Sequence, residues 1–319
     1  MTSPLMQVED LSISFKINDK WCRAVNGVTF DIMPNETLCI VGESGCGKSI
    51  TAMSLMKLLP DTARLGGHVR FGGQDILSLK ERELEEIRGS RIAMIFQEPM
   101  TSLNPVLTVG EQIAEPLVLH KGMGWSEAKK EARNLLDLVR IPDAQKRLGQ
   151  YPHELSGGMR QRVMIAIGLA CRPQILIADE PTTALDVTIQ AQVLALLEDI
   201  RKEQELSIVM ITHDLGVVAN VADRVAVMYA GDVVETGPVA SIFDSPSHPY
   251  TQALLRTVPR ADAAFELSPI EGQVPSIQKM PEGCRFAPRC KEETSKCNVT
   301  PKLSPGAHSV ACWARGDIQ

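Results

Sequence analysis

The sequence predicts an α/β fold built around a parallel sheet. Four short apolar runs each end abruptly in a polar residue, and such runs suit parallel strands that are covered on both faces. Helical periodicity between the third and fourth runs indicates a crossover helix. The runs are residues 38–41, 92–96, 175–178 and 206–211, and the helical positions are Ile189, Val193, Leu196, Leu197 and Ile200.

The residues that end these runs predict one shared site. Ligands of parallel sheets collect at the carboxyl ends of the strands. We therefore expect the polar residues that follow the runs to face a common ligand. They are Gly42, Gln97, Asp179, Thr212 and His213.

The segment after the first run fits the phosphate-binding pattern G-x-x-x-x-G-K-[ST]. It stands between a predicted strand and an apolar helix that begins near Ile50, which is the context that this motif requires. Its glycines let backbone N–H groups turn toward phosphate oxygens. We expect Lys48 to reach the β- and γ-phosphates and the Ser49 hydroxyl to bind Mg²⁺. The predicted nucleotide-binding residues are Gly42, Ser44, Gly45, Cys46, Gly47, Lys48, Ser49 and Ile50.

Two acidic residues, Asp179 and Glu180, directly follow the third run. An acid at the end of a buried strand can hold Mg²⁺ through water, and a second acid beside it can orient the attacking water. A pair of acids at a strand end can also be a solvated turn. The phosphate-binding motif upstream favours a catalytic pair, with Glu180 as the general base.

Length and charge limit the classes of function. The 319 residues allow about two domains. The net charge of −6 has the wrong sign for a broad nucleic-acid surface, so we expect no nucleic-acid partner. No apolar stretch approaches the ~18 to 20 residues that span a bilayer, and the first ten residues lack a signal-peptide pattern, so we expect a cytoplasmic chain.

The pattern along the chain predicts two domains, residues 1–245 and 246–319. A helical insertion is expected at about 98–165, and a hairpin is expected to turn at 230–232. Nine of the 20 prolines follow residue 244, which indicates a loop-rich extension. The helices expected in the insertion are 111–119, 126–139 and 159–170.

The extension also contains four of the eight cysteines within residues 284–312. In a cytosolic chain such crowding indicates metal binding before disulfides. Four thiolates suit either an iron–sulfur cluster or a tetrahedral zinc ion, and reduced structural cysteines are the alternative. The four residues are Cys284, Cys290, Cys297 and Cys312.

The motifs together resemble those of ATP-binding-cassette (ABC) ATPases. The segment 155–161 resembles the ABC signature, which in this family contacts the γ-phosphate bound to a second cassette. Ser156 can cap a helix there, and Gly157 and Gly158 leave backbone amides open to an anion. Those residues alone would describe an ordinary helix cap. Their position between the phosphate-binding motif and the acid pair favours the signature.

The resemblance spans residues 5–245 and implies a P-loop NTPase fold: a RecA-like parallel-sheet core, an N-terminal antiparallel β part and a helical subdomain. Gln97 matches the glutamine that touches Mg²⁺ and the membrane partner, and His213 matches the switch histidine. Residues 184–186 match the D-loop, with Asp186 at the nucleotide. The family stacks adenine on an aromatic residue of the first hairpin; Phe15 is favoured here and Trp21 is also available.

A closer resemblance joins the chain to the ATPases of bacterial dipeptide and oligopeptide importers, a subfamily that includes importers of nickel and glutathione. It rests on residues 100–105 and on His248-Pro249-Tyr250-Thr251 with the leucines at 254 and 255. In relatives of the dipeptide type, a similar cysteine pattern binds a [4Fe-4S] cluster. The resemblance thus favours iron–sulfur over Zn²⁺ at the four cysteines.

These resemblances imply an ATPase with ATP and Mg²⁺ as cofactors that powers import of di- or oligopeptides or a related solute. The implied partners are a second, different ATPase subunit, two transmembrane permease subunits and an external solute-binding protein. The chain would lie peripherally on the cytoplasmic face of the bacterial inner membrane. The alternatives are a soluble ABC ATPase of translation or DNA repair and a structural metal-binding protein with a vestigial P-loop.

Overall fold

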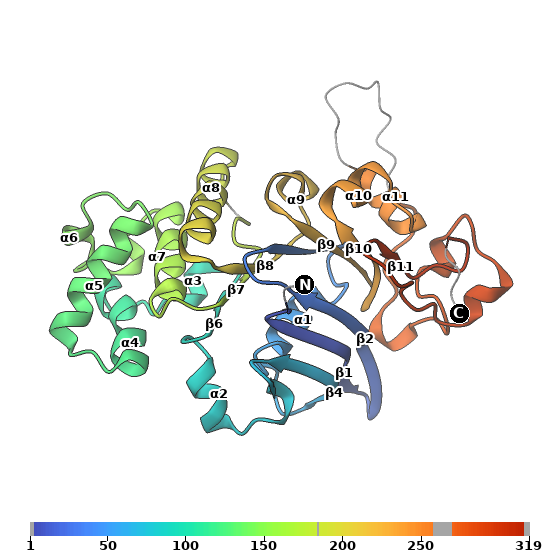
Figure 1. The fold of residues 1–319 in the computed structure, drawn as a ribbon, viewed down its shortest axis with the longest axis horizontal. Helices are drawn as coiled ribbons and strands as arrows, with labels where there is room; N and C mark the ends of the chain where they lie inside the picture. Colours follow the sequence, from blue (N-terminus) through green and yellow to red (C-terminus); the bar gives the residue numbers. More distant parts are fainter. Residues whose placement is uncertain (1–2, 184, 258–269, 316–319) are drawn as a thin grey trace. The chain divides into compact units, whose positions relative to one another are not determined.

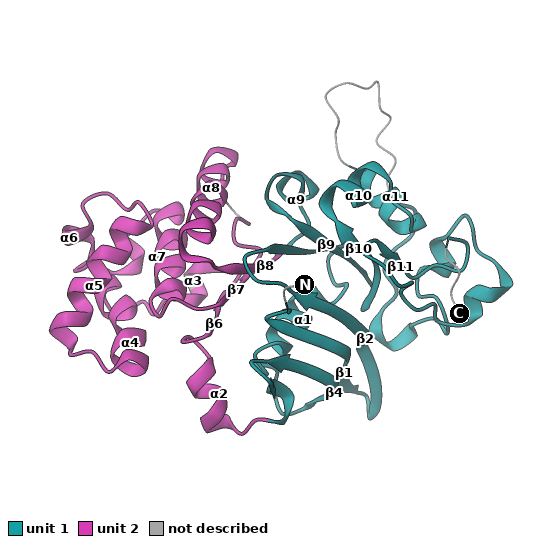
Figure 2. Ribbon diagram, in the orientation of Figure 1, with its two compact units in different colours: residues 1–78, 211–319 teal, residues 79–210 magenta. Residues whose placement is uncertain are grey.

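A computed structural model describes residues 3–183, 185–257 and 270–315 (Figure 1). The chain divides into two compact units, coloured separately in Figure 2. Unit 1 comprises residues 1–78 and 211–319, and unit 2 comprises residues 79–210. The phosphate-binding motif and the C-terminal extension thus belong to the same unit. The domain boundary expected at residue 245 is not tested by this division and stays a prediction.

Unit 1 begins with a four-stranded antiparallel sheet in the order β2-β1-β4-β5. Apolar side chains of β1 alternate with more exposed ones, as in a strand with one face on the core. A bulge interrupts the pairing of β1 with β4 near Asp10, whose φ is +48°. The strands are β1 (Met6–Ile17), β2 (Lys20–Ile32), β4 (Ala63–Phe71) and β5 (Gln74–Asp75).

Four further strands of unit 1 lie in the order β11-β10-β9-β3. All residues of β3 are buried, as expected of the first apolar run, and β3 pairs in parallel with β9. The predicted hairpin is confirmed, because β9 and β10 are antiparallel across a turn at residues 230 and 231. The strands are β3 (Thr37–Val41), β9 (Arg224–Tyr229), β10 (Asp232–Pro238) and β11 (Ser309–Val310).

The helices of unit 1 are short, and the described part of the extension consists mainly of loops. Residues 270–315 contain three 3-10 turns and the two-residue strand β11, which pairs with β10. The helical segments are α1 (Lys48–Ser54), η1 (Ile76–Ser78), α9 (Leu215–Val221), α10 (Val239–Asp244), α11 (Pro249–Leu255), η3 (Ile277–Lys279), η4 (Ala287–Arg289) and η5 (Ser295–Asn298).

Unit 2 contains three strands in the order β8-β7-β6, and the chain passes into unit 1 near the end of β8. Strands β6 and β7 pair in parallel. Strands β3, β6, β7 and β8 correspond to the four predicted apolar runs. All residues of β7 and β8 are buried. The strands are β6 (Ile92–Ile95), β7 (Ile175–Asp179) and β8 (Ser207–Thr212).

The predicted helical insertion is present in unit 2, where α4 packs against α5 and α7 (Figure 1). Thr108 and Glu111 form a capping box at the start of α4, and Gly122 ends it with φ +65°. The helix α5 is amphipathic and buries alanine and leucine side chains on one face. The segments are α2 (Glu81–Ile87), α3 (Pro99–Ser102), α4 (Val109–Lys121), α5 (Trp125–Leu138), α6 (Ala144–Arg147), η2 (Pro152–Glu154), α7 (Gly157–Leu169) and α8 (Val187–Gln204).

The predicted crossover helix is α8, which connects β7 to β8. Its apolar face is buried at Val193, Leu196, Leu197 and Ile200, as the helical period predicted. Across the residues that the structure describes, every helix is too short or too polar to cross a membrane.

Candidate active site

The phosphate-binding loop of unit 1 connects β3 to α1 and needs glycine at two points. A Cβ atom on Gly42 would lie 2.0 Å from the carbonyl oxygen of Met228 in β9. Gly47, at the start of α1, has φ +101°, a conformation that side chains disfavour. The loop backbone therefore passes too close to β9 and turns too sharply for larger residues.

Lys48 lies at the centre of this loop and is 5% exposed. Its Nζ donates hydrogen bonds to the carbonyl oxygens of Gly42, at 2.8 Å, and Glu43, at 3.1 Å. The Sγ of Cys46 lies 3.8 Å from the same nitrogen. The loop thus curves around a buried ammonium group, a positive charge that can pair with phosphate. In a nucleotide complex, phosphate oxygens could replace these two carbonyl oxygens as acceptors for the ammonium group.

Tyr250 supports the same loop, and the sequence analysis did not assign it a role. Its hydroxyl accepts a 2.9 Å hydrogen bond from the backbone N–H of Glu43. The side chain is fully buried and contacts Tyr229 and Phe286. His248 caps α11 by accepting a bond from the Tyr250 N–H, which fixes the start of that helix. The motif at 248–251, which marked a resemblance, therefore positions a tyrosine against the loop.

The two aromatic residues proposed for adenine lie near the turn of the β1–β2 hairpin. Phe15 is half-buried and pairs with Cys22 across the hairpin. Trp21 is 40% exposed, and the guanidinium carbon of Arg64 lies 3.7 Å from its ring centroid. Arg64 therefore already stacks on Trp21. The choice of Phe15 stays a prediction.

In unit 2 the acid pair ends β7. Asp179 is its last residue and is 6% exposed. Glu180 follows with φ +46°, a strained conformation that occurs often at functional sites. Its carboxylate accepts hydrogen bonds from the amide of Gln97, at 3.0 Å, and from the hydroxyl of Thr183, at 2.8 Å. The structure therefore brings together two of the predicted catalytic residues, Gln97 and Glu180, and adds Thr183, which the sequence analysis missed.

These groups fit the chemistry predicted for them. A buried carboxylate such as that of Asp179 offers the oxygen ligands that Mg²⁺ prefers. Glu180 is oriented by two donors and is only half-buried, so water can reach it. An oriented carboxylate with access to water can act as a general base.

The predicted signature residues lie at the start of α7 in unit 2. Ser156 caps the helix, as expected, by accepting a 3.4 Å hydrogen bond from the N–H of Met159. Asp186 caps α8 in the same way by accepting a 2.9 Å bond from Ile189. Both helix starts line one open hollow of about 440 Å³. It is bordered by Ser156, Gly157, Gly158, Met159, Arg162, Leu185, Asp186 and Ile189. Ala184, the first residue of the expected D-loop, lies outside the described residues.

Gly158 also has a packing role. A Cβ atom there would lie 2.8 Å from the Cγ2 atom of Ile189, whereas a Cβ atom on Gly157 would meet only Leu185, at 3.9 Å. Gly158 therefore permits the close approach of α7 to α8, and Gly157 faces open space. A substitution at Gly157 is therefore a better test for a ligand in the hollow than a substitution at Gly158.

His213, the predicted switch residue, follows β8 in unit 1 and is exposed. The next residue, Asp214, caps α9 by accepting hydrogen bonds from the N–H groups of Gly216 and Val217. The imidazole thus stands at the junction of a buried strand and a capped helix.

The four clustered cysteines are half-buried, and none of them forms a disulfide. Burial raises the pKa of the Cys284 thiol to about 11 and raises the pKa of Cys290 and Cys312; neighbouring thiolates act in the same direction. Among the described residues, however, no group of three or more His, Cys, Asp or Glu side chains is arranged to hold a metal ion. The side-chain positions therefore do not support the expected iron–sulfur or zinc site.

A buried lysine in a glycine loop, a strand-end acid pair and a glycine-rich helix start define a P-loop ATPase of the cassette type. Residues 25–183 match the family described as ABC transporter, and residues 234–297 match the family described as oligopeptide/dipeptide transporter, C-terminal region. The chain belongs to the ABC transporter family of ATPases, in the group that carries this C-terminal region.

Two named relatives match almost the whole chain. It is 53% identical to the oligopeptide transport ATP-binding protein OppD of Salmonella typhimurium, over 95% of this chain and 91% of the relative. It is 51% identical to the dipeptide transport ATP-binding protein DppD of Bacillus subtilis, over 97% of this chain and 94% of the relative.

Solved structures confirm the cassette fold. The ATP-binding cassette MJ0796, determined as a dimer bound to ADP and Pi, matches with a TM-score of 0.66 and 29% identity, over 73% of this chain and 98% of that one. CbiO1 of Clostridium perfringens, part of the transporter complex cbiONQ, matches with a TM-score of 0.65 and 28% identity, over 76% of this chain and 91% of that one.

Proposed function

We propose that this chain binds and hydrolyses ATP to power a membrane importer of dipeptides, oligopeptides or a related small solute. The observation that carries the proposal is the phosphate-binding motif at 42–49, which lies between β3 and α1 and holds the buried ammonium group of Lys48. Relatives named as oligopeptide and dipeptide transport ATP-binding proteins support the substrate class.

In this proposal Lys48 and the loop at 42–49 bind the phosphates, and Ser49, Asp179 and Gln97 hold Mg²⁺. The bound metal ion would neutralise charge on the phosphates. Glu180 orients and deprotonates the attacking water, and His213 contacts the transferred phosphate. A second cassette would present its own Ser156, Gly157, Gly158 and Asp186 to the nucleotide.

The partners follow from the same proposal. Membrane passage would be supplied by two permease subunits in separate chains, with a second ATPase subunit and an external solute-binding protein. The chain would lie peripherally on the cytoplasmic face of the inner membrane.

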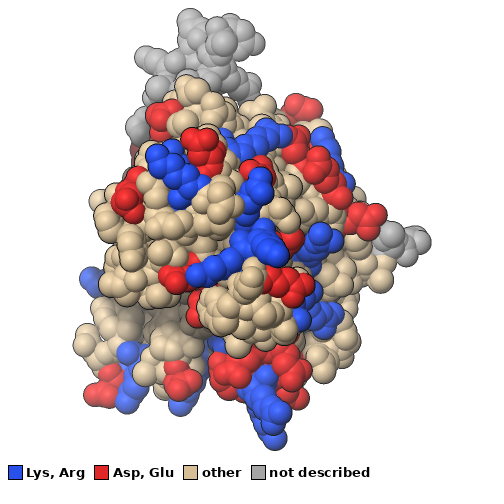
Figure 3. Space-filling view, turned by 90° about the vertical axis from the view of Figure 1, so that its left-hand side faces the viewer, with Lys and Arg blue, Asp and Glu red and all other residues tan. Residues whose placement is uncertain are grey.

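The alternative role in translation or DNA repair is not favoured. Figure 3 shows basic and acidic side chains interspersed across one face of the described residues, and the net charge of the chain is −6, the wrong sign for a broad nucleic-acid surface.

We also propose that the four clustered cysteines bind a metal centre, with [4Fe-4S] preferred to Zn²⁺. The crowding of four thiols within residues 284–312 supports this proposal, although among the described residues their side chains are not arranged to hold a metal ion. Metal binding would displace the thiol protons. Iron and acid-labile sulfide in anaerobically purified protein would support a cluster. One zinc per chain would support the alternative, and absence of both would contradict the proposal.

The central proposal is tested by ATP binding and by transport. Lys48→Ala removes a charged donor to phosphate, so the affinity for ATP should fall by roughly 10-fold or more. Lys202→Ala, on the exposed side of α8, is the matched control and should bind ATP normally. The complex reconstituted with its permeases should import peptide only with ATP and wild-type Lys48. Normal ATP affinity in Lys48→Ala would overturn the proposal.

A further inference from the structure

Arg289, in the C-terminal extension, is bound directly to the phosphate-binding loop. Its Nη1 and Nη2 atoms donate to the two carboxylate oxygens of Glu43, at 2.7 and 3.2 Å. Its side chain is 6% exposed, and that of Glu43 is 27% exposed. A two-pronged guanidinium–carboxylate pair with this burial fixes both partners in one geometry.

The rest of the Arg289 side chain is held by the extension and by β9. Its Nε donates to the carbonyl oxygen of Glu271, at 2.8 Å, and Nη2 also lies 3.2 Å from the carbonyl oxygen of Ile270. Nη1 donates to the hydroxyl of Tyr229, at 3.3 Å. These contacts orient the guanidinium group independently of Glu43. The position of the group therefore depends on the fold of the extension.

Glu43 is in turn fixed at every polar group. Arg289 binds its carboxylate, the Tyr250 hydroxyl accepts from its N–H, and Lys48 donates to its carbonyl oxygen. Lys48 and Glu43 thus share a bond within the loop that receives phosphate. A displacement of Glu43 would therefore be transmitted to the lysine.

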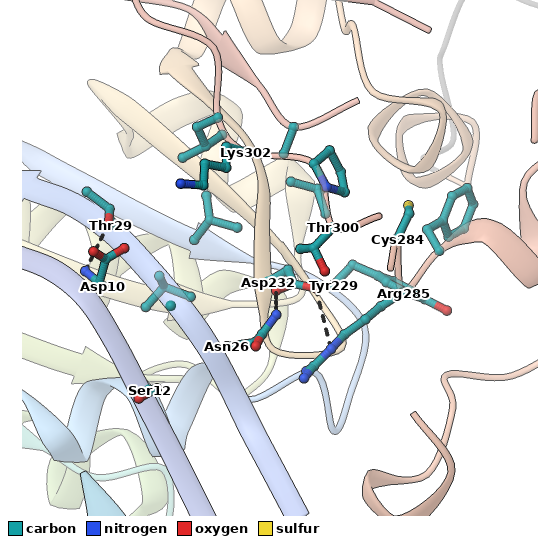
Figure 4. Close-up of a pocket in the computed structure, with 18 of the residues that line it drawn as sticks. Asp10, Ser12, Asn26, Thr29, Tyr229, Asp232, Cys284, Arg285, Thr300 and Lys302 are labelled. Carbon is teal, nitrogen blue, oxygen red and sulfur yellow. Dashed lines mark hydrogen bonds and ion pairs between the residues drawn. The ribbon is translucent and has the colours of Figure 1, made fainter. Parts of the chain in front are cut away.

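A second set of contacts connects the extension to the same loop. Arg285 donates to the carbonyl oxygen of Ala230 and forms an ion pair with Asp232, which also accepts from Asn26 (Figure 4). Gly231 lies between Ala230 and Asp232 in the same turn, and its N–H donates to the carbonyl oxygen of Cys46 in the phosphate-binding loop, at 2.8 Å. The β9–β10 turn thus lies between the extension and the loop.

The cavity drawn in Figure 4 lies beside this turn. It has a volume of about 550 Å³ and is bordered by β2, the β9–β10 hairpin and the extension. Among the described residues, none of 42–49 lines it. The cavity is therefore distinct from the phosphate-binding loop, and its walls include the contacts that join the loop to the extension.

The charge of Glu43 explains why such a contact is needed. Position 43 is one of the variable positions of G-x-x-x-x-G-K-[ST], so phosphate binding itself does not require an acid there. A carboxylate in a loop that binds polyphosphate repels the ligand, and the repulsion is strong where water is partly excluded. Arg289 supplies the compensating positive charge and holds the carboxylate fixed.

We infer that Arg289 is a positioning residue for the nucleotide: it neutralises and fixes Glu43, and so the C-terminal extension sets the affinity of the phosphate-binding loop for ATP. This inference rests on the proposed function. Arg289 touches Glu43 rather than the loop's phosphate-binding groups, so it acts through Glu43. The extension thus contributes to ATP binding through the contact between Arg289 and Glu43.

The test measures ATP binding to the full-length chain by titration. Arg289→Ala should weaken binding by roughly 10-fold, the effect of losing one charge-assisted interaction. Arg315→Ala is the matched control, because Arg315 is an arginine of the same extension that pairs with Glu292, away from the loop. It should bind ATP as the wild type does.

A double variant separates electrostatics from folding. Arg289→Ala combined with Glu43→Gln removes both charges, so binding should recover most of the loss seen in Arg289→Ala. Glu43→Gln alone should bind ATP at least as tightly as the wild type, which keeps the test decisive if Arg289→Ala folds poorly. In the assembled transporter, Arg289→Ala should raise KM for ATP and leave kcat nearly unchanged.

Three results would overturn the inference: wild-type ATP affinity in Arg289→Ala, equal weakening in the single and double variants, or clearly weaker binding in Glu43→Gln. The second result would show that Arg289 only stabilises the fold. Failure of the wild-type chain to bind ATP would instead overturn the proposed function, and with it the inference.

Discussion

The side-chain amide of Gln97 donates a 3.0 Å hydrogen bond to the carboxylate of Glu180. The two residues follow β6 and β7, which pair in parallel, so the bond joins the carboxyl ends of neighbouring strands. The Thr183 hydroxyl donates a second bond to the same carboxylate. Glu180 is thus oriented from two sides by residues of its own unit.

This arrangement predicts the effect of Glu180→Gln. A glutamine amide is nearly the same size but cannot take a proton from water. The variant should retain ATP binding, whereas ATP hydrolysis by the assembled complex should fall by ~10² or more. Phosphate release and ATP titration measure the two effects separately. Glu203→Gln, on α8, is the control, and wild-type turnover in Glu180→Gln would show that the base lies elsewhere.

The hollow at the starts of α7 and α8 predicts the effect of a charge at Gly157. The Cβ atom of an aspartate there would meet only Leu185, at 3.9 Å, so the substitution introduces a charge without a clash at Cβ. If a second cassette's nucleotide binds here, repulsion of its phosphates should abolish hydrolysis in the assembled complex and spare ATP binding by the isolated chain.

Gly157→Ala adds the Cβ atom without the charge and should hydrolyse ATP close to the wild-type rate. Gly158→Asp is a weaker test, because its Cβ atom would lie 2.8 Å from Ile189 and any loss could come from altered packing. Normal hydrolysis by Gly157→Asp in the complex would refute the assignment of the signature segment.

Local sequence patterns predicted most of the fold. The four apolar runs became β3, β6, β7 and β8, and the glycine loop stands between a strand and a helix as its motif required. Ser156 caps α7 as expected. These features depend on residues within a few positions of one another, so periodicity and motif spacing are sufficient to predict them.

The contacts that support the phosphate-binding loop could not be predicted in this way. Arg289 lies 246 residues from Glu43 in sequence, and Tyr250 lies 207 residues from it. One arginine among several in a proline-rich extension has no local pattern that indicates its partner. The one signal that the sequence offers is Glu43 itself. An acidic residue in a phosphate-binding loop indicates that a basic residue elsewhere in the chain compensates its charge.

Buried Glu235 predicts a large effect on stability. Its carboxylate accepts from the backbone N–H groups of Ser247 and His248, at 2.7 and 2.9 Å, and lies 2.7 Å from Nε2 of His308. It is fully buried, so Glu235→Ala would leave these polar groups without an acceptor. The free energy of unfolding should fall by about 3 kcal/mol or more.

Urea denaturation of the full chain measures this loss. Glu235→Gln keeps one acceptor oxygen and should lose less stability than Glu235→Ala. Glu203→Ala, on the exposed side of α8, should change stability by no more than ~0.5 kcal/mol. An unchanged midpoint for Glu235→Ala would show that water replaces the lost acceptor.

His248 predicts how stability depends on pH. Burial lowers the pKa of its imidazole to about 3, from the ordinary value of 6.5. Between these values the unfolded chain binds a proton that the folded chain does not, so stability falls as the pH falls from about 6.5 toward 3. The contribution of this one residue is up to about 1.4 kcal/mol for each pH unit.

His248→Asn has no titrating side chain and keeps an oxygen that can cap α11 and accept from the Tyr250 N–H. Carboxylates titrate over the same range in both proteins, so the difference between them isolates the imidazole. Urea denaturation at pH 7 and pH 5 should therefore show the wild type losing about 1 to 2 kcal/mol more than His248→Asn on acidification. Equal losses in the two proteins would mean that the imidazole accepts a proton in the folded state.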